Sequence, residues 1–342
     1  MYGRPAGRPY DLRTEMGSIL SVKDLKVHFV TAGRTVRALD GVNFEIEEGK
    51  TFGLVGETGC GKSVTALSVL RLIPYPPGKI VGGEVRFRGR DLLALSGEEI
   101  RSIRGKEISM IFQEPMTSLN PVFRIGDQMS EVIRLHQGLN RSKAWAKAEE
   151  MLERVRIPDA RRVARQFPHQ LSGGMRQRVM IAMELSCHPY LLIADEPSTA
   201  LDVTIQAQIL RLIREMKEEF HTSILLITHD LGVIAEMCDR VGVMYAGSIV
   251  EEAGVEDIFE SPKHPYTQGL WGAIPRIDEE KEALSVIPGM VPDLSNPPAG
   301  CRFHPRCAHR FGPCDQTVPS LLVIAPGHRV ACFLYRERGG HG

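Results

Sequence analysis

The sequence predicts an α/β protein with a parallel core sheet, an antiparallel β subdomain, a helical insert and a small, irregular, cysteine-rich C-terminal module. Short apolar runs such as residues 191–194 alternate with helical segments at 204–220 and 230–237, which is the pattern of a parallel sheet. A glycine-rich segment follows the apolar run 51–55, as it does where such a sheet binds phosphate. Past about residue 260 the composition changes to Pro, Gly, His and Cys, which marks the second module.

The elements follow one another in a consistent order. Residues 19–29 and 42–46 alternate apolar and polar side chains, as half-exposed strands do, so the antiparallel subdomain precedes the parallel core. Apolar positions recur at helical spacing from 125 to 155 among many charged residues, which predicts the helical insert with a solvated outer face. Further core strands are expected at 223–228 and 241–245.

The 342 residues suit about two domains. Residues 1–17 lack the apolar stretch of a secretory signal, and we expect a flexible N-terminal tail there. The main domain is expected at 18–260, with its helical subdomain at about 115–185, and the C-terminal module at 261–342. Lys and Arg total 42 and Asp and Glu also total 42, so no net charge attracts nucleic acid or anionic lipid. No apolar run approaches the length of a membrane-spanning helix.

The glycine-rich segment 56–63 reads Gly-Glu-Thr-Gly-Cys-Gly-Lys-Ser, a pattern that cradles the phosphates of a nucleoside triphosphate. Its glycines let backbone N–H groups converge on phosphate oxygens, and the following helix points its positive dipole end at the same anion. Lys62 would reach the β- and γ-phosphates, and Ser63 would hold Mg²⁺. The expected nucleotide contacts are Gly56, Glu57, Thr58, Gly59, Cys60, Gly61, Lys62, Ser63 and Val64.

Two adjacent carboxylates end the apolar run 191–194. A buried strand end is a costly place for charges unless they have a task. Asp195 is expected to reach Mg²⁺ directly or through water, and Glu196 to polarise the attacking water. The alternative is that the two carboxylates only solvate the strand end or cap the next helix.

A second anion-binding helix start is predicted at Leu-Ser-Gly-Gly-Met, residues 171–175. Ser172 would offer a hydroxyl and Gly173 and Gly174 backbone donors, yet the chain has one Lys-bearing cradle, so this surplus requires a partner. Here the sequence resembles the ATP-binding-cassette (ABC) family, whose signature Leu-Ser-Gly-Gly-Gln it matches except for Met175. The resemblance implies that two cassettes dimerise head to tail, each signature capping the ATP held by the other. An ordinary capped helix is the alternative.

The resemblance implies roles for four more residues. Gln113 matches the glutamine that contacts Mg²⁺ and the water, and His229 the histidine that contacts the γ-phosphate and orients Glu196. Phe29 matches the aromatic residue that stacks on adenine, although a core position is an open alternative. Asp202 matches a residue of the loop through which the two cassettes communicate, a role that is compatible with capping a helix.

The tail resembles that of oligopeptide/dipeptide importer ATPases, on His-Pro-Tyr-Thr at 264–267 and Gly-Cys-Arg-Phe-His-Pro-Arg-Cys at 300–307. Clustered cysteines in an intracellular ATPase indicate a metal more than a disulfide, and a C-x₂₋₄-C pair typical of zinc is missing. We expect a [4Fe–4S] cluster, as the resemblance also implies for some members; Zn²⁺ with help from His304, His309 or His328, and free or disulfide-forming cysteines, remain open. The expected ligands are Cys301, Cys307, Cys314 and Cys332.

Together these motifs predict an ATP-hydrolysing subunit of a membrane importer. Two ATP molecules would lie between this cassette and a second ABC ATPase, a paralogue or a copy of this chain. Closure would drive two transmembrane permease subunits through the loop 113–121. The resemblance implies uptake of di- or oligopeptides delivered by an extracellular solute-binding protein, with this subunit peripheral on the cytoplasmic face of the membrane.

The alternative is a soluble ABC ATPase that acts on nucleic acid or the ribosome. Residues 261–342 contain nine Lys and Arg against seven Asp and Glu, which makes no strong basic surface, so no nucleic-acid partner is expected. Dipeptides, longer peptides, nickel complexes and glutathione all remain open as the cargo.

Overall fold

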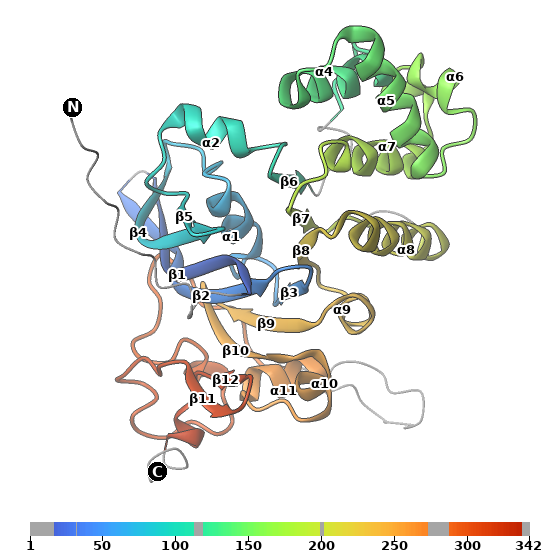
Figure 1. The fold of residues 1–342 in the computed structure, drawn as a ribbon. Coiled ribbons are helices and arrows are strands. Elements are labelled where there is room, and N and C mark those ends of the chain that lie inside the picture. Colours follow the sequence, from blue (N-terminus) through green and yellow to red (C-terminus); the bar gives the residue numbers. More distant parts are fainter. Residues whose placement is uncertain (1–16, 32, 113–118, 199–201, 273–286, 337–342) are drawn as a thin grey trace, which may run out of the picture.

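The computed structural model describes residues 17–31, 33–112, 119–198, 202–272 and 287–336. An eight-stranded sheet runs through the molecule in the order β11-β12-β10-β9-β3-β8-β7-β6 (Figure 1). Its five strands from β9 to β6 are parallel to one another, and β10, β12 and β11 continue the sheet from β9 in antiparallel pairing. The strands are β3 (Thr51–Val55), β6 (Ile108–Ile111), β7 (Leu191–Asp195), β8 (Ser223–Ile227), β9 (Arg240–Tyr245), β10 (Ser248–Gly254), β11 (Leu322–Ala325) and β12 (His328–Val330).

The predicted antiparallel subdomain is a second sheet, in the order β2-β1-β4-β5. Its strands are β1 (Ser18–Thr31), β2 (Arg34–Glu47), β4 (Gly78–Phe87) and β5 (Arg90–Asp91). Buried apolar residues such as Val27 and Leu39 face the core and charged residues face solvent, which explains the alternation seen in the sequence.

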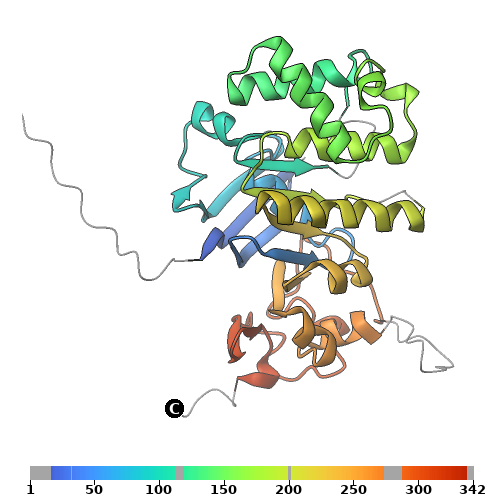
Figure 2. The ribbon, with the colours of Figure 1, turned by 45° about the vertical axis from the view of Figure 1, so that its right-hand side comes forward.

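Helices α4 to α7 gather beyond the β6 edge of the large sheet, and residues 287–336 lie beyond its β10 strand (Figures 1 and 2). The helices of the insert therefore form one body, at the end of the molecule opposite the C-terminal segment. The helices are α1 (Lys62–Val69), α2 (Gly97–Ile103), α4 (Ile125–Gln137), α5 (Arg141–Arg154), α6 (Ala160–Ala164), α7 (Gly173–Leu185), α8 (Val203–Phe220), α9 (Leu231–Met237), α10 (Val255–Glu260) and α11 (Pro265–Gly272). Short 3₁₀ turns occupy Pro168–Gln170, His304–Arg306 and Phe333–Tyr335.

The parallel strands are apolar throughout because both faces of the large sheet are covered. Leu192 and Leu226 pack into a cluster with helices α7, α8 and α9. Leu191 and Leu225, which point to the opposite face, pack into a cluster with α1 and the antiparallel sheet. Every residue of β3, β7 and β8 is buried, so the carboxyl ends of these strands hold whatever polar groups follow them in fixed positions.

The C-terminal segment continues the core sheet through β12, where Val330 pairs with Glu251 of β10. Glu251 is completely buried and accepts hydrogen bonds from the backbone N–H groups of Lys263 (2.7 Å) and His264 (2.8 Å). Its Oε1 also lies 2.7 Å from Nε2 of His328. One buried carboxylate therefore joins three separate stretches of the chain.

Candidate functional site

The glycine-rich turn between β3 and α1 lies at the carboxyl end of the central strand. We call residues 56–61 the phosphate loop. Gly56 has φ +151° and an added Cβ there would lie 2.1 Å from the carbonyl oxygen of Met244. Gly61, which precedes the first turn of α1, has φ +110°, and its Cβ would lie 2.7 Å from Leu39. Any other residue at these two positions would displace the backbone, so the loop shape requires glycine.

Lys62 is the first residue of α1, and its side chain turns back into the phosphate loop. Its Nζ donates to the carbonyl oxygens of Gly56 (2.7 Å) and Glu57 (3.2 Å). Thr58 and Gly59 are exposed, so the outer turn of the loop is open to solvent. Cys60 is a buried residue on the inner side of the loop, and burial raises the pKa of its thiol and keeps it protonated. The loop therefore presents one ammonium group and a solvent-facing backbone to an anion.

Asp195 ends β7 beside this loop and is 4% exposed. Burial raises the pKa of the Asp195 carboxyl and Glu196 adds to that effect, whereas Ser63 and Lys62 act in the opposite direction. Its Oδ1 atom is buried and has no hydrogen-bond partner among the residues that the structure describes. A buried carboxylate oxygen without a donor, next to a hydroxyl, fits the oxygen ligands that Mg²⁺ prefers.

Glu196 and His229 meet because they follow neighbouring parallel strands, β7 and β8. Glu196 takes the left-handed conformation, with φ +48°, and its backbone N–H donates to Ile227 at 2.8 Å. This backbone turn directs its carboxylate toward His229, whose Nδ1 lies 3.2 Å from Glu196 Oε1. The His229 side chain is 66% exposed and the Glu196 side chain 15%, so the pair lies at the surface of the strand ends.

Ser172 and Asp202 each cap a helix. The Ser172 hydroxyl accepts from the N–H of Met175 at 3.3 Å, and Asp202 Oδ1 accepts from the N–H of Ile205 at 2.9 Å. The two helix starts are neighbours, since an added Cβ on Gly174 would lie 3.1 Å from Ile205. Helix α7 packs against α5, α8 and β6, whereas α1 packs against β2 and β7. Figure 1 likewise shows the start of α7 apart from α1 within one chain.

The structure describes two of the three other predicted nucleotide contacts. Phe29 of β1 is half-buried, and a Cβ added to Gly78 of β4 would lie 2.7 Å from its ring. Val64 is partly buried against the cluster beneath α1. Gln113 lies outside the described residues, as does most of the segment predicted to contact the permeases.

Sequence reasoning missed several residues that hold these groups in place. Gln177 of α7 is 2% exposed and donates from Nε2 to the carbonyl oxygen of Pro197, which links the Ser172 helix to the turn after Glu196. Tyr266 of α11 and Arg306 of the C-terminal segment both contact Glu57 of the phosphate loop. Tyr266 and Arg306 lie in the two tail motifs at 264–267 and 300–307, but the sequence showed no sign of these contacts, because each joins residues that are distant along the chain.

The four C-terminal cysteines line one small cavity of about 20 Å³, together with aromatic side chains that include Phe303 and Phe333. Burial raises the pKa of the Cys301 and Cys307 thiols, and that of Cys332 to about 11. Among the described residues, no group of three or more His, Cys, Asp or Glu side chains has the arrangement of a metal site. The four cysteines therefore lie around one cavity, and none of them forms a disulfide.

The three histidines considered for zinc differ in position. His304 and His309 line the cysteine cavity, and His304 Nδ1 lies 2.9 Å from the carbonyl oxygen of Cys301. His328 lies on β12 and hydrogen-bonds to Glu251 instead.

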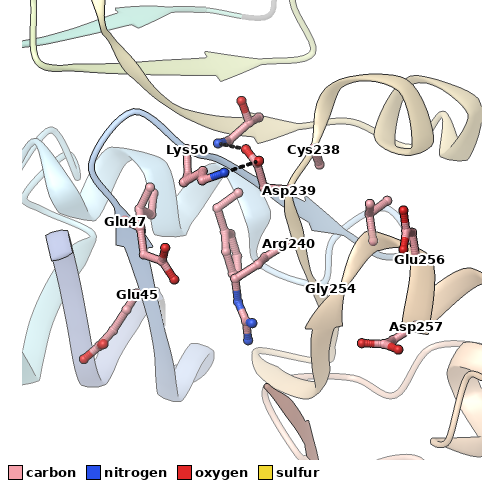
Figure 3. Close-up of a pocket in the computed structure, with 13 residues that line it drawn as sticks. Glu45, Glu47, Lys50, Cys238, Asp239, Arg240, Gly254, Glu256 and Asp257 are labelled. Carbon is pink, nitrogen blue, oxygen red and sulfur yellow. Dashed lines mark hydrogen bonds and ion pairs between the residues drawn. The ribbon is translucent and has the colours of Figure 1, made fainter. Parts of the chain in front are cut away.

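A separate hollow of about 480 Å³ lies at the other end of the sheet (Figure 3). It is lined mainly by charged residues, and Lys50 lies 3.0 Å from Asp239 within it. Thr51, another lining residue, begins β3, whereas the phosphate loop follows the last residue of that strand. This hollow is therefore distinct from the predicted nucleotide site.

Comparison with known proteins identifies the family and the fold. A family model described as "ABC transporter" matches residues 39–199, and one described as "Oligopeptide/dipeptide transporter, C-terminal region" matches residues 250–314. The dimeric structure of the ATP-binding cassette MJ0796 bound to ADP and Pi has a TM-score of 0.62 and 26% identity, and the match covers 69% of this chain and 98% of that one. The fold and the phosphate loop thus define an ABC ATPase cassette.

Curated relatives narrow this class. The probable peptide ABC transporter ATP-binding protein y4tR of Sinorhizobium fredii is 54% identical, with 93% of this chain and 96% of that protein covered. The oligopeptide transport ATP-binding protein AppD of Bacillus subtilis is 51% identical, with 95% and 99% covered. The chain belongs to the family of peptide ABC transporter ATP-binding proteins, which are ATP-hydrolysing transporter subunits. The predicted family and ATPase activity are confirmed, and the nucleic-acid alternative finds no support.

Proposed function

We propose that this chain powers the uptake of di- or oligopeptides by hydrolysing ATP at the phosphate loop. The observation that carries the proposal is that three groups meet at one end of the large sheet. The loop with Lys62, the buried Asp195 beside Ser63, and the Glu196–His229 pair all follow neighbouring strands or begin α1. Each group has a task in phosphoryl transfer to water.

Lys62 holds the β- and γ-phosphates, and the backbone of residues 56–64 surrounds them. Ser63 and Asp195 would hold Mg²⁺, for which Asp195 Oδ1, without a hydrogen-bond partner among the described residues, is a suitable ligand, and Gln113 would complete the set. The ion neutralises charge on the phosphates when it is bound. Glu196 takes up the proton of the attacking water, and His229 orients the Glu196 carboxylate. Phe29 packs on the adenine ring.

A second cassette completes the site. The exposed Ser172 hydroxyl and the backbone N–H groups of Gly173 and Gly174 lie at the start of α7, apart from the phosphate loop of their own chain. We assign them to the nucleotide held by a partner ATPase, a paralogue or a second copy of this chain. Asp202, which caps the neighbouring helix α8, contacts the same partner. A related cassette, MJ0796, has been solved as a dimer.

The membrane partners are two permease subunits, supplied with peptide by an extracellular solute-binding protein. None of the helices in the described ranges combines the length and apolar character needed to cross a bilayer. Val122 and Phe123, just before α4, are 70% and 53% exposed and give the helical subdomain (about 115–185) an apolar contact surface. We place the subunit peripherally on the cytoplasmic face of the membrane, with the cassette at 18–260, the C-terminal module at 261–342 and a tail at 1–17.

For the C-terminal module we propose a [4Fe–4S] cluster on Cys301, Cys307, Cys314 and Cys332, which share one cavity. Four thiols are the donor set that such a cluster requires. Iron and acid-labile sulfide in anaerobically purified protein would support this assignment. Zinc without sulfide would instead favour Zn²⁺ with help from His304 or His309, and protein without metal would leave free thiols.

The catalytic assignment is tested with Glu196→Gln, which keeps the side-chain shape and removes the base. We expect ATP to hold the variant as a dimer, detected by size-exclusion chromatography, because the closed state forms but hydrolysis is blocked. Lys62→Ala should bind MgATP weakly. Glu256→Gln is the matched control for Glu196→Gln, because Glu256 is an exposed glutamate at the opposite end of the sheet. Wild-type turnover in Glu196→Gln would contradict the proposed role.

A further inference from the structure

A buried arginine of the C-terminal segment reaches the phosphate loop. Arg306 Nη1 lies 2.7 Å from Glu57 Oε2, and Nη2 lies 3.1 Å from Oε1. This is a bidentate pair, the strongest geometry that arginine and carboxylate form. The Arg306 side chain is 5% exposed and that of Glu57 28%, although 249 positions separate them in sequence.

Several contacts fix the Arg306 guanidinium in this position. Its Nε donates to the carbonyl oxygen of Pro288 at 2.9 Å, and Nη1 also lies 3.4 Å from the hydroxyl of Tyr245. The 3₁₀ turn His304–Arg306 places its backbone. The hydrogen bonds to Glu57 raise the pKa of Arg306, so the guanidinium stays charged throughout the physiological pH range.

Glu57 connects this arginine to Lys62. Its backbone N–H donates to the hydroxyl of Tyr266 in α11 at 2.9 Å, so Tyr266 holds the main chain of this residue and Arg306 holds its carboxylate. The Glu57 carbonyl oxygen accepts from the N–H of Cys60 at 3.2 Å and from Lys62 Nζ at 3.2 Å. A movement of Glu57 therefore moves a carbonyl oxygen that holds the lysine ammonium.

The negative charge of Glu57 affects how the phosphate loop binds an anion. A carboxylate in a loop that surrounds a triphosphate repels the ligand unless a cation neutralises it. We propose that Arg306 is a positioning residue for nucleotide binding: it neutralises Glu57 and, with Tyr266, fixes the first turn of the phosphate loop. The inference rests on the proposed function, because it takes residues 56–63 to be the triphosphate site.

The test compares affinities for MgATP, measured by isothermal titration calorimetry on the full-length protein. Arg306→Met removes the cation and leaves the Glu57 carboxylate without it. We expect the Kd to rise about tenfold, which is the size of effect seen when a residue that holds a ligand-binding group in place is lost. The double variant Glu57→Gln/Arg306→Met removes both charges and should recover most of the affinity. Arg306→Lys keeps the charge and should lose less than Arg306→Met.

Arg302→Met is the matched control. Arg302 lies in the same segment, its side chain is 12% exposed, and its Nη2 lies 2.5 Å from Asp40 of β2 rather than from the phosphate loop. We expect this variant to lose thermal stability comparably to Arg306→Met but to keep the wild-type Kd.

The outcomes separate the inference from the proposed function. Loss of MgATP binding in Lys62→Ala, with an unchanged Kd in Arg306→Met, would overturn the role of Arg306 alone. Equal weakening in Arg302→Met and Arg306→Met, or no recovery in the double variant, would also overturn it. Wild-type protein that does not bind MgATP would instead refute the nucleotide site itself.

Discussion

Replacement of Glu251 by Gln tests how the C-terminal segment is attached to the cassette. Glu251 Oε1 accepts from the backbone N–H of Lys263 and lies 2.7 Å from His328 Nε2, while Oε2 accepts from the N–H of His264. In the Glu251→Gln variant, the new side chain can place its oxygen at the position of Oε1. Its NH₂ group then faces the N–H of His264, donor against donor, in a site with no solvent access.

The expected loss of local stability depends on the number of buried polar groups left without partners. Each buried polar group without a partner costs about 1–3 kcal/mol, so two facing donors cost about 3 kcal/mol in local stability. The amides of residues 263 and 264 should then exchange with deuterium about a hundredfold faster, because every 1.4 kcal/mol is about a factor of ten. Hydrogen exchange followed by mass spectrometry on peptides that cover this turn provides the measurement.

The neighbouring residue supplies the control. Glu252 is 2% exposed and accepts from Arg240 and Arg329, so Glu252→Gln disturbs an equally buried carboxylate of the same strand but a different set of partners. Exchange at 263 and 264 should stay near the wild-type rate in this variant. If Glu251→Gln leaves these amides as protected as before, the buried carboxylate does not hold the turn and the reasoning fails.

Three further predictions concern single groups. Gly56→Ala should abolish MgATP binding in a calorimetric titration, because the new Cβ would lie 2.1 Å from the carbonyl oxygen of Met244. A Cβ at Gly59 would have nothing within 4 Å, so Gly59→Ala should lower the stability of the loop by only about 1–3 kcal/mol, through backbone strain. Burial lowers the pKa of His264 to about 4 from a usual 6.5, so its stabilising contribution is complete above pH 6.5 and is lost as the pH falls toward 4. The melting temperature should therefore fall less steeply with decreasing pH for His264→Asn than for the wild-type protein. Asp202→Ala removes the cap of α8 and should lower the free energy of unfolding in urea by about 1 kcal/mol, whereas Asp202→Asn should retain it.

Local chemistry explains which parts of the site could be predicted. The phosphate loop was visible because backbone donors, a lysine and a hydroxyl must follow one another within eight residues, and the structure places these at the end of β3. Asp195 and Glu196 were visible because an apolar strand ends in charge. Pairing over long separations leaves no such trace. Arg306 lies in the tail motif at 300–307, but the sequence did not indicate its pairing with Glu57, which lies 249 positions away.

The C-terminal half of the large sheet was harder to predict for a related reason. Glu251 and Glu252 give β10 the composition of a surface strand, yet both are buried, because β12 pairs with β10 on its outer side. The sequence indicated a separate irregular module past residue 260, and it could not show that residues 322–330 continue the core sheet. Strand pairing depends on side chains from both segments, and neither segment alone specifies its neighbour.

The order in which the strands lie also sets when the nucleotide site can form during synthesis. β3 ends at Val55, but its two sheet neighbours are β8 and β9, which end at Ile227 and Tyr245. At about 5–20 residues per second, a ribosome needs roughly ten seconds or more to make the intervening chain, and longer to reach the arginine that pairs with Glu57. A nascent chain therefore carries the complete glycine-rich motif long before it has the scaffold to shape it, and fragments that stop short of β9 leave the central strand without one of its neighbours.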